Sequence, residues 1–384
     1  MHILVIPSWY ETPQNKTLGS FFKEQATALQ EQGCQIGIIY SEPVSIKRFS
    51  RYFETDNKKY SCLTLKRKKY LCIPFCYDTN LRLHIRNYKK LYAQYVAEHG
   101  KPDLIHAHSF MYGPGGAAGL AAYEIAQQFN VKYVVTEHAS ALLLDNIKPK
   151  ELKAIEAASI HAQQIFAVSK SLSLLMHNKL ALSQPPHVIG NVIDTHLFRP
   201  VPLSQSRYTF ITVAQLRPIK EINKILYAFA DVQKDHPETA LFIVGDGPDK
   251  PALENLAHSL ALNHVQFFGS VARTRVANLL QESHCYINWS KYETFSVAVH
   301  EAISCGLRVI SSACQGPEES LEHCGELICK SNSSQALART MMFLLSDPNN
   351  NAMSADQKHM FITQKFGKKA IAEQLIKEYK KIVL

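Results

Sequence analysis

Residues 285–306 read "CYINWSKYETFSVAVHEAISCG", and this stretch joins a short apolar strand to a helix. The first six residues predict the strand, and the apolar residues after Ser296 predict a helix that ends at Gly306. Thr294 and Ser296 are small polar residues at the expected helix entrance, where free backbone N–H groups and the positive end of the helix dipole bind phosphate. Units of this kind build parallel sheets that are covered by helices.

The same alternation of apolar runs and helical periodicity continues along the whole chain. Before the middle of the chain the runs are "ILVIP", "QIGIIYS", "DLIHAHS", "KYVVTEH", "QIFAVSK" and "HVIGNV". The series restarts near Tyr208 with "YTFITVAQ", "ALFIVGDG", "VQFFGS", "CYINWS", "LRVISSA" and "ELICK". A polar, Pro-containing segment at 194–207 separates the two sets and is typical of a linker or hinge.

The pattern therefore predicts an α/β protein with two Rossmann-like, doubly wound domains that face each other across a cleft. We expect the first domain at residues 1–200 and the second at 201–366. Apolar residues at helical spacing in "KKAIAEQLIKEYKKIVL" predict a terminal helix at 367–384, which packs back on the first domain.

Composition excludes several other classes of protein. The 384 residues include 46% hydrophobic and 20% charged residues, which is typical of a folded chain. No signal-peptide h-region and no spanning-length apolar run is visible, so we expect a cytoplasmic protein. The nine cysteines include no C-x-x-C pair, which argues against a zinc ribbon or a disulfide framework.

Positive charge is concentrated between residues 47 and 90. This stretch holds thirteen Lys or Arg residues against three acidic ones, whereas the whole chain carries a net charge of +9. Aromatic residues alternate with the cations, a combination that suits an anionic membrane surface. A solvated, lysine-rich face is the alternative interpretation. No nucleic-acid-binding module accompanies the charge, so we expect no nucleic-acid partner.

Two glutamates, Glu293 and Glu301, flank the helix entrance and could address sugar or ribose hydroxyls, although a bare pair with this spacing is typical of solvated helix ends. Arg217 and Lys220 follow an earlier strand, in "VAQLRPIKEINKILYAFA". Two cations at that position can neutralise a diphosphate leaving group.

In this order, the motifs resemble the retaining GT-B glycosyltransferases of family four. The matching stretches are "GDGP", "VQFFG", the E-x7-E pair, "GPEE", the linker "IGNVIDTHLFRP" and the opening "IPSWYETPQNKTLGSFFKEQATALQEQG". The resemblance covers nearly the whole chain, and E-x7-E with its neighbours is its specific part.

The resemblance implies a role for each matching residue. Glu293 acts at the donor sugar, and Glu301 binds the nucleotide ribose. Arg217 and Lys220 offset the diphosphate charge, while Gly19 brings a backbone N–H to the diphosphate from the first domain. The backbone N–H groups that bind the diphosphate and sugar belong to Thr294, Phe295, Ser296 and Val297.

Histidines mark the first domain. "DLIHAHS" places His106 and His108 on one face of a strand, and His138 ends a neighbouring strand. The resemblance implies that His108 is catalytic and lies near the transferred sugar; we expect His138 at the acceptor or sugar and His106 in the core. A metal site of three histidines is the alternative, but no carboxylate or cysteine completes it. Family members generally need no metal, and the chain has no D-x-D, so no cofactor is expected.

Two positions depart from the family pattern. Gln215 stands where the family usually has Arg directly after the strand, and Val192 replaces the usual Gly of the linker. A rival motif, G-x-G-x-x-A at 113–118 with Glu137 beyond it, has the outline of a dinucleotide fingerprint, but it follows a later strand of its domain instead of the first.

The sequence therefore predicts a retaining transferase that moves a sugar from a nucleoside diphosphate sugar, such as a UDP-sugar, to an acceptor hydroxyl. The acceptor is expected to be lipid-linked or a polysaccharide of bacterial surface glycan assembly, with the enzyme peripheral on the inner face of the cell membrane. A nucleotide-sugar epimerase and a non-catalytic nucleotide-sugar-binding protein are the alternatives.

Overall fold

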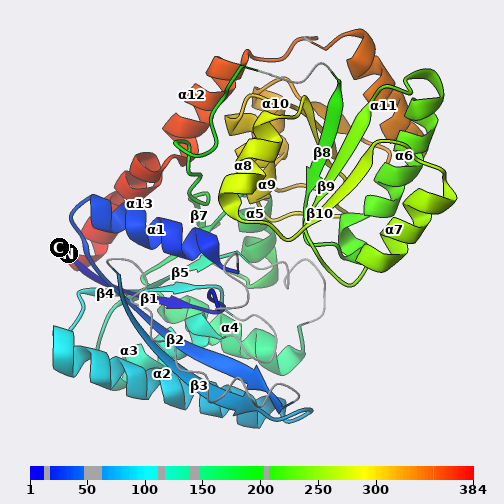
Figure 1. The fold of residues 1–384 in the computed structure, drawn as a ribbon. Helices are drawn as coiled ribbons and strands as arrows, with labels where there is room; N and C mark the ends of the chain where they lie inside the picture. The colour runs from blue at the N-terminus through cyan, green and yellow to red at the C-terminus, as the bar shows by residue number, and fades with distance from the viewer. Residues whose placement is uncertain (13–17, 47–62, 111–116, 139–146, 203–206, 349) are drawn as a thin grey trace. The chain divides into compact units, whose positions relative to one another are not determined.

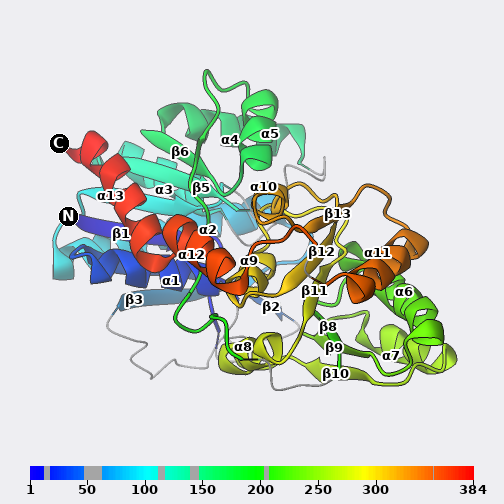
Figure 2. The ribbon, with the colours of Figure 1, turned by 90° about the horizontal axis from the view of Figure 1, so that it is seen from above.

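The computed structural model describes residues 1–12, 18–46, 63–110, 117–138, 147–202, 207–348 and 350–384. Its contacts divide the chain into two compact units (Figures 1 and 2). Unit 1 comprises Met1–Val192 together with Lys368–Leu384, and unit 2 comprises Ile193–Gly367.

Unit 1 is built on a parallel sheet with the strand order β3-β2-β1-β4-β5-β6-β7. Helices α1 and α13 pack on each other on one face of the sheet, and α2 and α3 pack on each other on the opposite face (Figure 1). Its elements are β1 (His2–Pro7), α1 (Ser20–Glu31), β2 (Gln35–Ser45), β3 (Thr64–Cys72), α2 (Tyr77–His99), β4 (Leu104–His108), α3 (Ala118–Phe129), β5 (Tyr133–Glu137), α4 (Pro149–His161), β6 (Gln164–Ala167), α5 (Lys170–Lys179), β7 (His187–Val188) and α13 (Lys368–Val383).

Unit 2 repeats this plan with the strand order β10-β9-β8-β11-β12-β13, again with parallel pairing throughout. Its elements are β8 (Thr209–Val213), a 3₁₀ turn (Pro218–Lys220), α6 (Ile222–Asp235), β9 (Ala240–Val244), α7 (Lys250–Ser259), β10 (Val265–Gly269), α8 (Arg273–Gln281), β11 (Cys285–Asn288), α9 (Val297–Ser304), β12 (Arg308–Ser312), α10 (Glu318–His323), β13 (Leu327–Cys329), α11 (Ser334–Ser346) and α12 (Ala355–Phe366).

The six strand runs expected after the linker correspond to β8 to β13, because fully covered parallel strands are continuous apolar runs. Helices α6, α7 and α11 cover one face of the unit 2 sheet, and α8 and α9 cover the other, with α12 packed on α9 (Figure 1). Buried Phe210, Leu226, Phe229 and Trp289 belong to the core between the sheet and α6 and α11. Unit 2 thus has the doubly wound fold that the sequence predicts, with helices on both faces of a parallel sheet.

The unit boundary lies between Val192 and Ile193, ahead of the position expected at residue 200. The intervening segment is hydrogen-bonded to unit 2: Ser304 Oγ donates to the carbonyl of Phe198 over 2.6 Å, and Gln281 Nε2 donates to that of Arg199 over 3.0 Å. The terminal helix α13 belongs to unit 1, where Tyr379 Oη bonds to His106 Nδ1 at 2.5 Å.

Among the described residues, no helix is both long and apolar enough to cross a membrane. The cysteines that the structure describes are free thiols. Residues 47–62 of the basic stretch and residues 113–116 of the rival glycine motif lie outside the described residues.

Candidate active site

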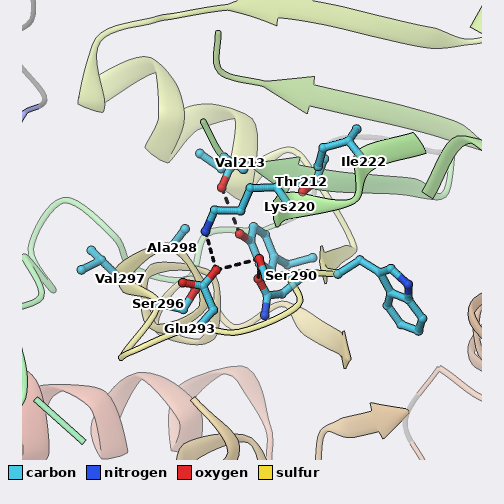
Figure 3. A pocket seen from close by; sticks show the side chains of 13 residues that line it. Thr212, Val213, Lys220, Ile222, Ser290, Glu293, Ser296, Val297 and Ala298 are labelled. Atoms are coloured by element: carbon cyan, nitrogen blue, oxygen red, sulfur yellow. Dashed lines mark hydrogen bonds and ion pairs between the residues drawn. The ribbon is translucent and has the colours of Figure 1, made fainter. Parts of the chain in front are cut away.

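A cavity of about 130 Å³ opens in unit 2 at the carboxyl ends of β8 and β11. These two strands are neighbours, and the strand order reverses between them, which is where doubly wound folds bind their ligands. The lining side chains are Thr212, Val213, Ala214, Lys220, Ile222, Tyr286, Asn288, Trp289, Ser290, Glu293, Ser296, Val297 and Ala298 (Figure 3).

Glu293 lies at the centre of the polar contacts in this cavity. Its Oε1 is 2.5 Å from Lys220 Nζ and accepts a hydrogen bond from Ser290 Oγ at 2.7 Å (Figure 3). Ser290 is itself 3.3 Å from Asn288 Oδ1, and its carbonyl accepts from Ser312 Oγ. A carboxylate fixed by a cation and a hydroxyl cannot rotate freely, so it has a defined direction toward a bound ligand.

The loop that carries Glu293 is bound to the turn after β12. Glu293 N donates to the carbonyl of Cys314 over 2.8 Å, and Gly316 N donates to the carbonyl of Glu293 over 3.1 Å. A Cβ at Gly316 would lie 2.5 Å from the carbonyl carbon of Thr294, so only glycine permits this approach. The "GPEE" motif therefore positions the glutamate loop.

Helix α9 begins directly at the cavity. Ser296 adopts a left-handed conformation (φ 62°) at the N-cap, and Val297 and Ala298 line the cavity with the first turn. The first N–H groups of a helix have no intrahelical acceptor, and together with the dipole they favour an anion. This is the backbone geometry that the sequence predicts for diphosphate binding.

Phe295 contributes packing at this position. Its buried ring stacks on His300 with centroids 4.0 Å apart, and burial lowers the pKa of His300 to about 4. His300 Nδ1 donates to the carbonyl of Ser296 at 2.9 Å, and Nε2 contacts Ser320 Oγ at 3.0 Å. A neutral histidine thus fixes the entrance of α9.

Glu301 does not line the cavity. It lies on α9 with its side chain only 7% exposed, and its Oε1 is 2.7 Å from a guanidinium nitrogen of Arg273. Burial raises the pKa of Glu301, while Arg273 opposes this rise. The Arg273 guanidinium also lies over the ring of Phe198, 5.1 Å from its centroid.

The two predicted cations have different positions. Lys220 ends the 3₁₀ turn after β8 and points to Glu293, whereas Arg217 and Gln215 are exposed and do not line the cavity. Glu221 follows with a positive φ of 46°, a strained conformation for a side chain of this size. The turn thus directs the lysine, and not the arginine, toward the carboxylate.

The second group of predicted residues lies in unit 1, at the carboxyl ends of β4 and β5. His108 Nδ1 is 2.9 Å from His138 Nε2, and Phe22 contacts both rings. His108 Nε2 is buried without a hydrogen-bond partner among the described residues, and burial lowers the pKa of His108 well below its usual value. Gly19, the N-cap of α1, has a φ of 69°, and a Cβ there would lie 2.9 Å from the ring of Phe22.

The contacts of His106 and Glu137 bear on the two alternative interpretations of unit 1, a metal site and a dinucleotide site. His106 uses both ring nitrogens, with Tyr379 Oη at 2.5 Å and Thr136 Oγ1 at 2.7 Å. No group of three or more potential metal ligands occurs within the part of the chain that the structure describes. Glu137 is buried and accepts hydrogen bonds from the backbone N–H groups of Phe110 and His138, so its carboxylate is not presented to a ribose.

Sequence reasoning missed Ser290, Asn288 and Arg273. The signal for the first two is their position at the end of a strand, where polar side chains meet the ligand edge of a sheet. Arg273 gave no local signal, because its partner Glu301 lies on another helix.

Comparison with known proteins agrees with this geometry. Residues 18–197 match the family "Glycosyltransferase Family 4", and residues 194–360 match "Glycosyl transferases group 1". The chain belongs to the family-4 glycosyltransferases. The predicted family, the GT-B class of two Rossmann-like units and the assignment as a transferase enzyme are confirmed.

Individual members of the family show how far the similarity extends. N-acetyl-alpha-D-glucosaminyl L-malate synthase of Bacillus anthracis is 24% identical over 73% of this chain and 74% of its own length. A subunit of human phosphatidylinositol N-acetylglucosaminyltransferase is 24% identical over 86% of this chain and 66% of its own length. The solved structure of Anabaena Alr3699/HepE in complex with UDP superimposes with a TM-score of 0.76 at 18% identity, covering 99% of this chain and 100% of the other.

Proposed function

We propose that this glycosyltransferase moves a sugar from a nucleoside diphosphate sugar to an acceptor hydroxyl with retention of configuration. The observation that carries the proposal is the cavity of unit 2, where Lys220, Glu293 and the entrance of α9 meet at the switch point of the sheet. Lys220 and the entrance of α9 suit a diphosphate, and the Glu293 carboxylate suits sugar hydroxyls.

Each residue then has a task. Lys220 and the backbone N–H groups of residues 294–297 neutralise the diphosphate, with Arg217 and the Gly19 N–H as further contacts. Glu293 supports the positive charge that develops at the anomeric carbon, Glu301 binds the ribose, and His108 presents Nε2 to the transferred sugar with His138 behind it. Positive groups held close to the diphosphate stabilise the charge that develops on the leaving group.

The bond changes balance without a cofactor. The bond from the anomeric carbon to the diphosphate oxygen breaks, and the acceptor oxygen bonds to the same face of that carbon. The acceptor proton passes to the departing phosphate oxygen. We propose that Lys220 and the helix entrance take the place of a metal ion in this step.

The donor and the acceptor are proposed from the relatives. The UDP complex of HepE supports a UDP-sugar donor. The human relative acts, by its name, on phosphatidylinositol, which supports a lipid-linked acceptor. We propose that the enzyme meets this acceptor at the inner face of the cell membrane. The surplus of positive charge at residues 47–90 supports contact with an anionic surface.

A thermal-shift screen across UDP-, GDP- and ADP-sugars tests the proposal, because a ligand that binds only the folded state raises its melting temperature. We expect one nucleotide series to stabilise the protein, and release of free nucleoside diphosphate to require acceptor. Release without acceptor would favour an epimerase, and stabilisation without any turnover would favour a binding protein.

A further inference from the structure

The turn between β3 and α2 exposes large apolar side chains. Phe75 is 107% exposed relative to its reference state, Ile73 is 39% exposed, and Pro74 between them is also exposed. We call Ile73, Pro74 and Phe75 the apolar tip. Single exposed apolar residues are common on monomers, whereas adjacent exposed apolar side chains that form a patch mark interaction sites.

The apolar tip is fixed in place by two hydrogen bonds with the buried side chain of Asn80. Asn80 is only 2% exposed; its Oδ1 accepts from Ile73 N at 2.8 Å, and its Nδ2 donates to Ile73 O at 2.7 Å. Phe75 has a φ of 60°, a left-handed conformation that is strained for an aromatic residue. Strain of this kind persists where the surrounding structure imposes it, and it is frequent at functional sites.

A cavity of about 450 Å³ adjoins the apolar tip, between the first turns of α2 and α4. Phe75, Tyr77, Leu81 and Ala154 give it apolar walls. The charged residues in its lining are two lysines and two acids, Lys148, Lys150, Asp78 and Glu151. The apolar surface that is open to a partner therefore extends beyond Phe75 itself.

Cations follow the apolar tip along α2. Arg82, Arg86 and Lys90 are exposed and four residues apart, so they share one face of the helix. Over eight residues this row spans about 12 Å. At the first turn, Lys150 is paired with Asp78 at 2.6 Å, and Lys148 lies 5.6 Å from the ring centroid of Tyr77.

We propose that the apolar tip inserts into an anionic lipid bilayer while Arg82, Arg86 and Lys90 contact the lipid headgroups. The apolar tip suits the acyl chains in the interior of the bilayer, and the row of cations suits the phosphates of the headgroup layer. The tip lies at the carboxyl edge of the unit 1 sheet, as His108 does, because the strands are parallel. The inference rests on the proposed membrane acceptor, and it locates that contact within the described residues.

Depth-dependent fluorescence tests the insertion directly. The chain has two tryptophans, Trp9 and Trp289, so a Phe75→Trp variant adds one reporter at the tip. With phosphatidylcholine/phosphatidylglycerol vesicles at low salt, we expect brominated acyl chains to quench the fluorescence of the added tryptophan. Quenching should be weaker with vesicles of pure phosphatidylcholine. Ile160→Trp is the matched control, since Ile160 is 77% exposed near the far end of α4; its added emission should not be quenched.

Vesicle-binding affinities of further variants separate the apolar contribution of the tip from the electrostatic contribution of the cations. Phe75→Ser should weaken partitioning by about tenfold or more, with no loss from Ile160→Ser. Arg86→Gln should weaken binding to anionic vesicles about fivefold, with no effect from Arg339→Gln on unit 2. Vesicle binding without quenching at residue 75, or no binding to anionic vesicles at all, would overturn the inference. Nucleotide-sugar binding by the same variants is measured without lipid, so a failure of the proposed function is seen separately.

Discussion

Lys220 Nζ and Glu293 Oε1 are 2.5 Å apart in the cavity of unit 2, although they come from different strand-to-helix connections. The lysine that we assign to the diphosphate is thus the partner of the carboxylate that we assign to the sugar. A bound diphosphate attracts the same ammonium group, so donor binding redistributes this ion pair.

Removal of the Glu293 carboxylate tests its role at the reacting centre. Glu293→Gln is expected to lower kcat by about 100-fold or more while the Kd for the nucleoside diphosphate changes little, because the lost interaction belongs to the transition state. His108→Ala should give the same pattern. Steady-state kinetics with calorimetry on each variant checks this, and a loss confined to binding would contradict the assigned roles.

Arg273 is expected to control the ionisation of Glu301. Since burial raises the pKa of Glu301 and Arg273 lowers it, donor affinity should decrease as the pH falls through the pKa of Glu301. In Arg273→Ala this decrease should begin at a higher pH, and Arg273→Lys should restore part of the wild-type profile. Arg275→Ala, on the same helix but paired with Glu282, is the control for calorimetric titrations at several pH values. Identical profiles for all variants would exclude this coupling.

Gly316 is expected to be required for the glutamate loop. A Cβ at this position would lie 2.6 Å from Phe295 N and 2.7 Å from the carbonyl oxygen of Glu293, so Gly316→Ala must displace the loop. We expect a loss of about 1–3 kcal/mol in the free energy of unfolding and weaker donor binding. Gly33→Ala is the control for donor binding only: its φ of 83° makes a side chain costly there as well, but its Cβ would meet nothing within 4 Å and so would displace no loop. Unchanged donor binding in Gly316→Ala would refute the prediction.

Buried histidines are expected to make the protein sensitive to mild acid. Burial lowers the pKa of His300 to about 4 and those of His84 and His106 to about 3. The unfolded chain takes up these protons near pH 6.5, so the free energy of unfolding is fully retained above that pH. It should fall between about pH 6.5 and pH 4, by about 1.4 kcal/mol per pH unit for each histidine. Urea unfolding at pH 7.5, 6 and 5 measures this, and His300→Gln should reduce the slope.

Much of the fold follows from the sequence because buried parallel strands are apolar throughout. Strand β3, "TLKRKKYLC", was not predicted, because its cations conceal the pattern. Among the strands that the structure describes, it pairs only with β2, at the edge of the sheet, and edge strands tolerate or favour lysine. The lysines and arginines of this segment indicate a solvent-exposed surface, but its backbone forms a strand of the sheet.

The candidate site was predictable where its residues are close in sequence, as for Glu293 and the entrance of α9. The choice between Arg217 and Lys220 depends on the 3₁₀ turn at Pro218–Lys220, which aims only the lysine into the cavity. The pairing of Arg273 with Glu301 depends on the packing of α8 beside α9. Contacts between residues that are distant in sequence produce no periodic pattern from which they could be predicted.

The roles assigned to Lys220, Glu293 and the entrance of α9 all require the diphosphate to bind in the unit 2 cavity. The affinity of Lys220→Met for the nucleoside diphosphate measures whether it does. Calorimetry should show binding weakened about 10- to 100-fold relative to wild type, the range for loss of a charge-assisted contact. Lys224→Met, which removes a neighbouring lysine paired with Glu221, should bind normally. Equal affinity of Lys220→Met and wild type would show that the diphosphate binds elsewhere.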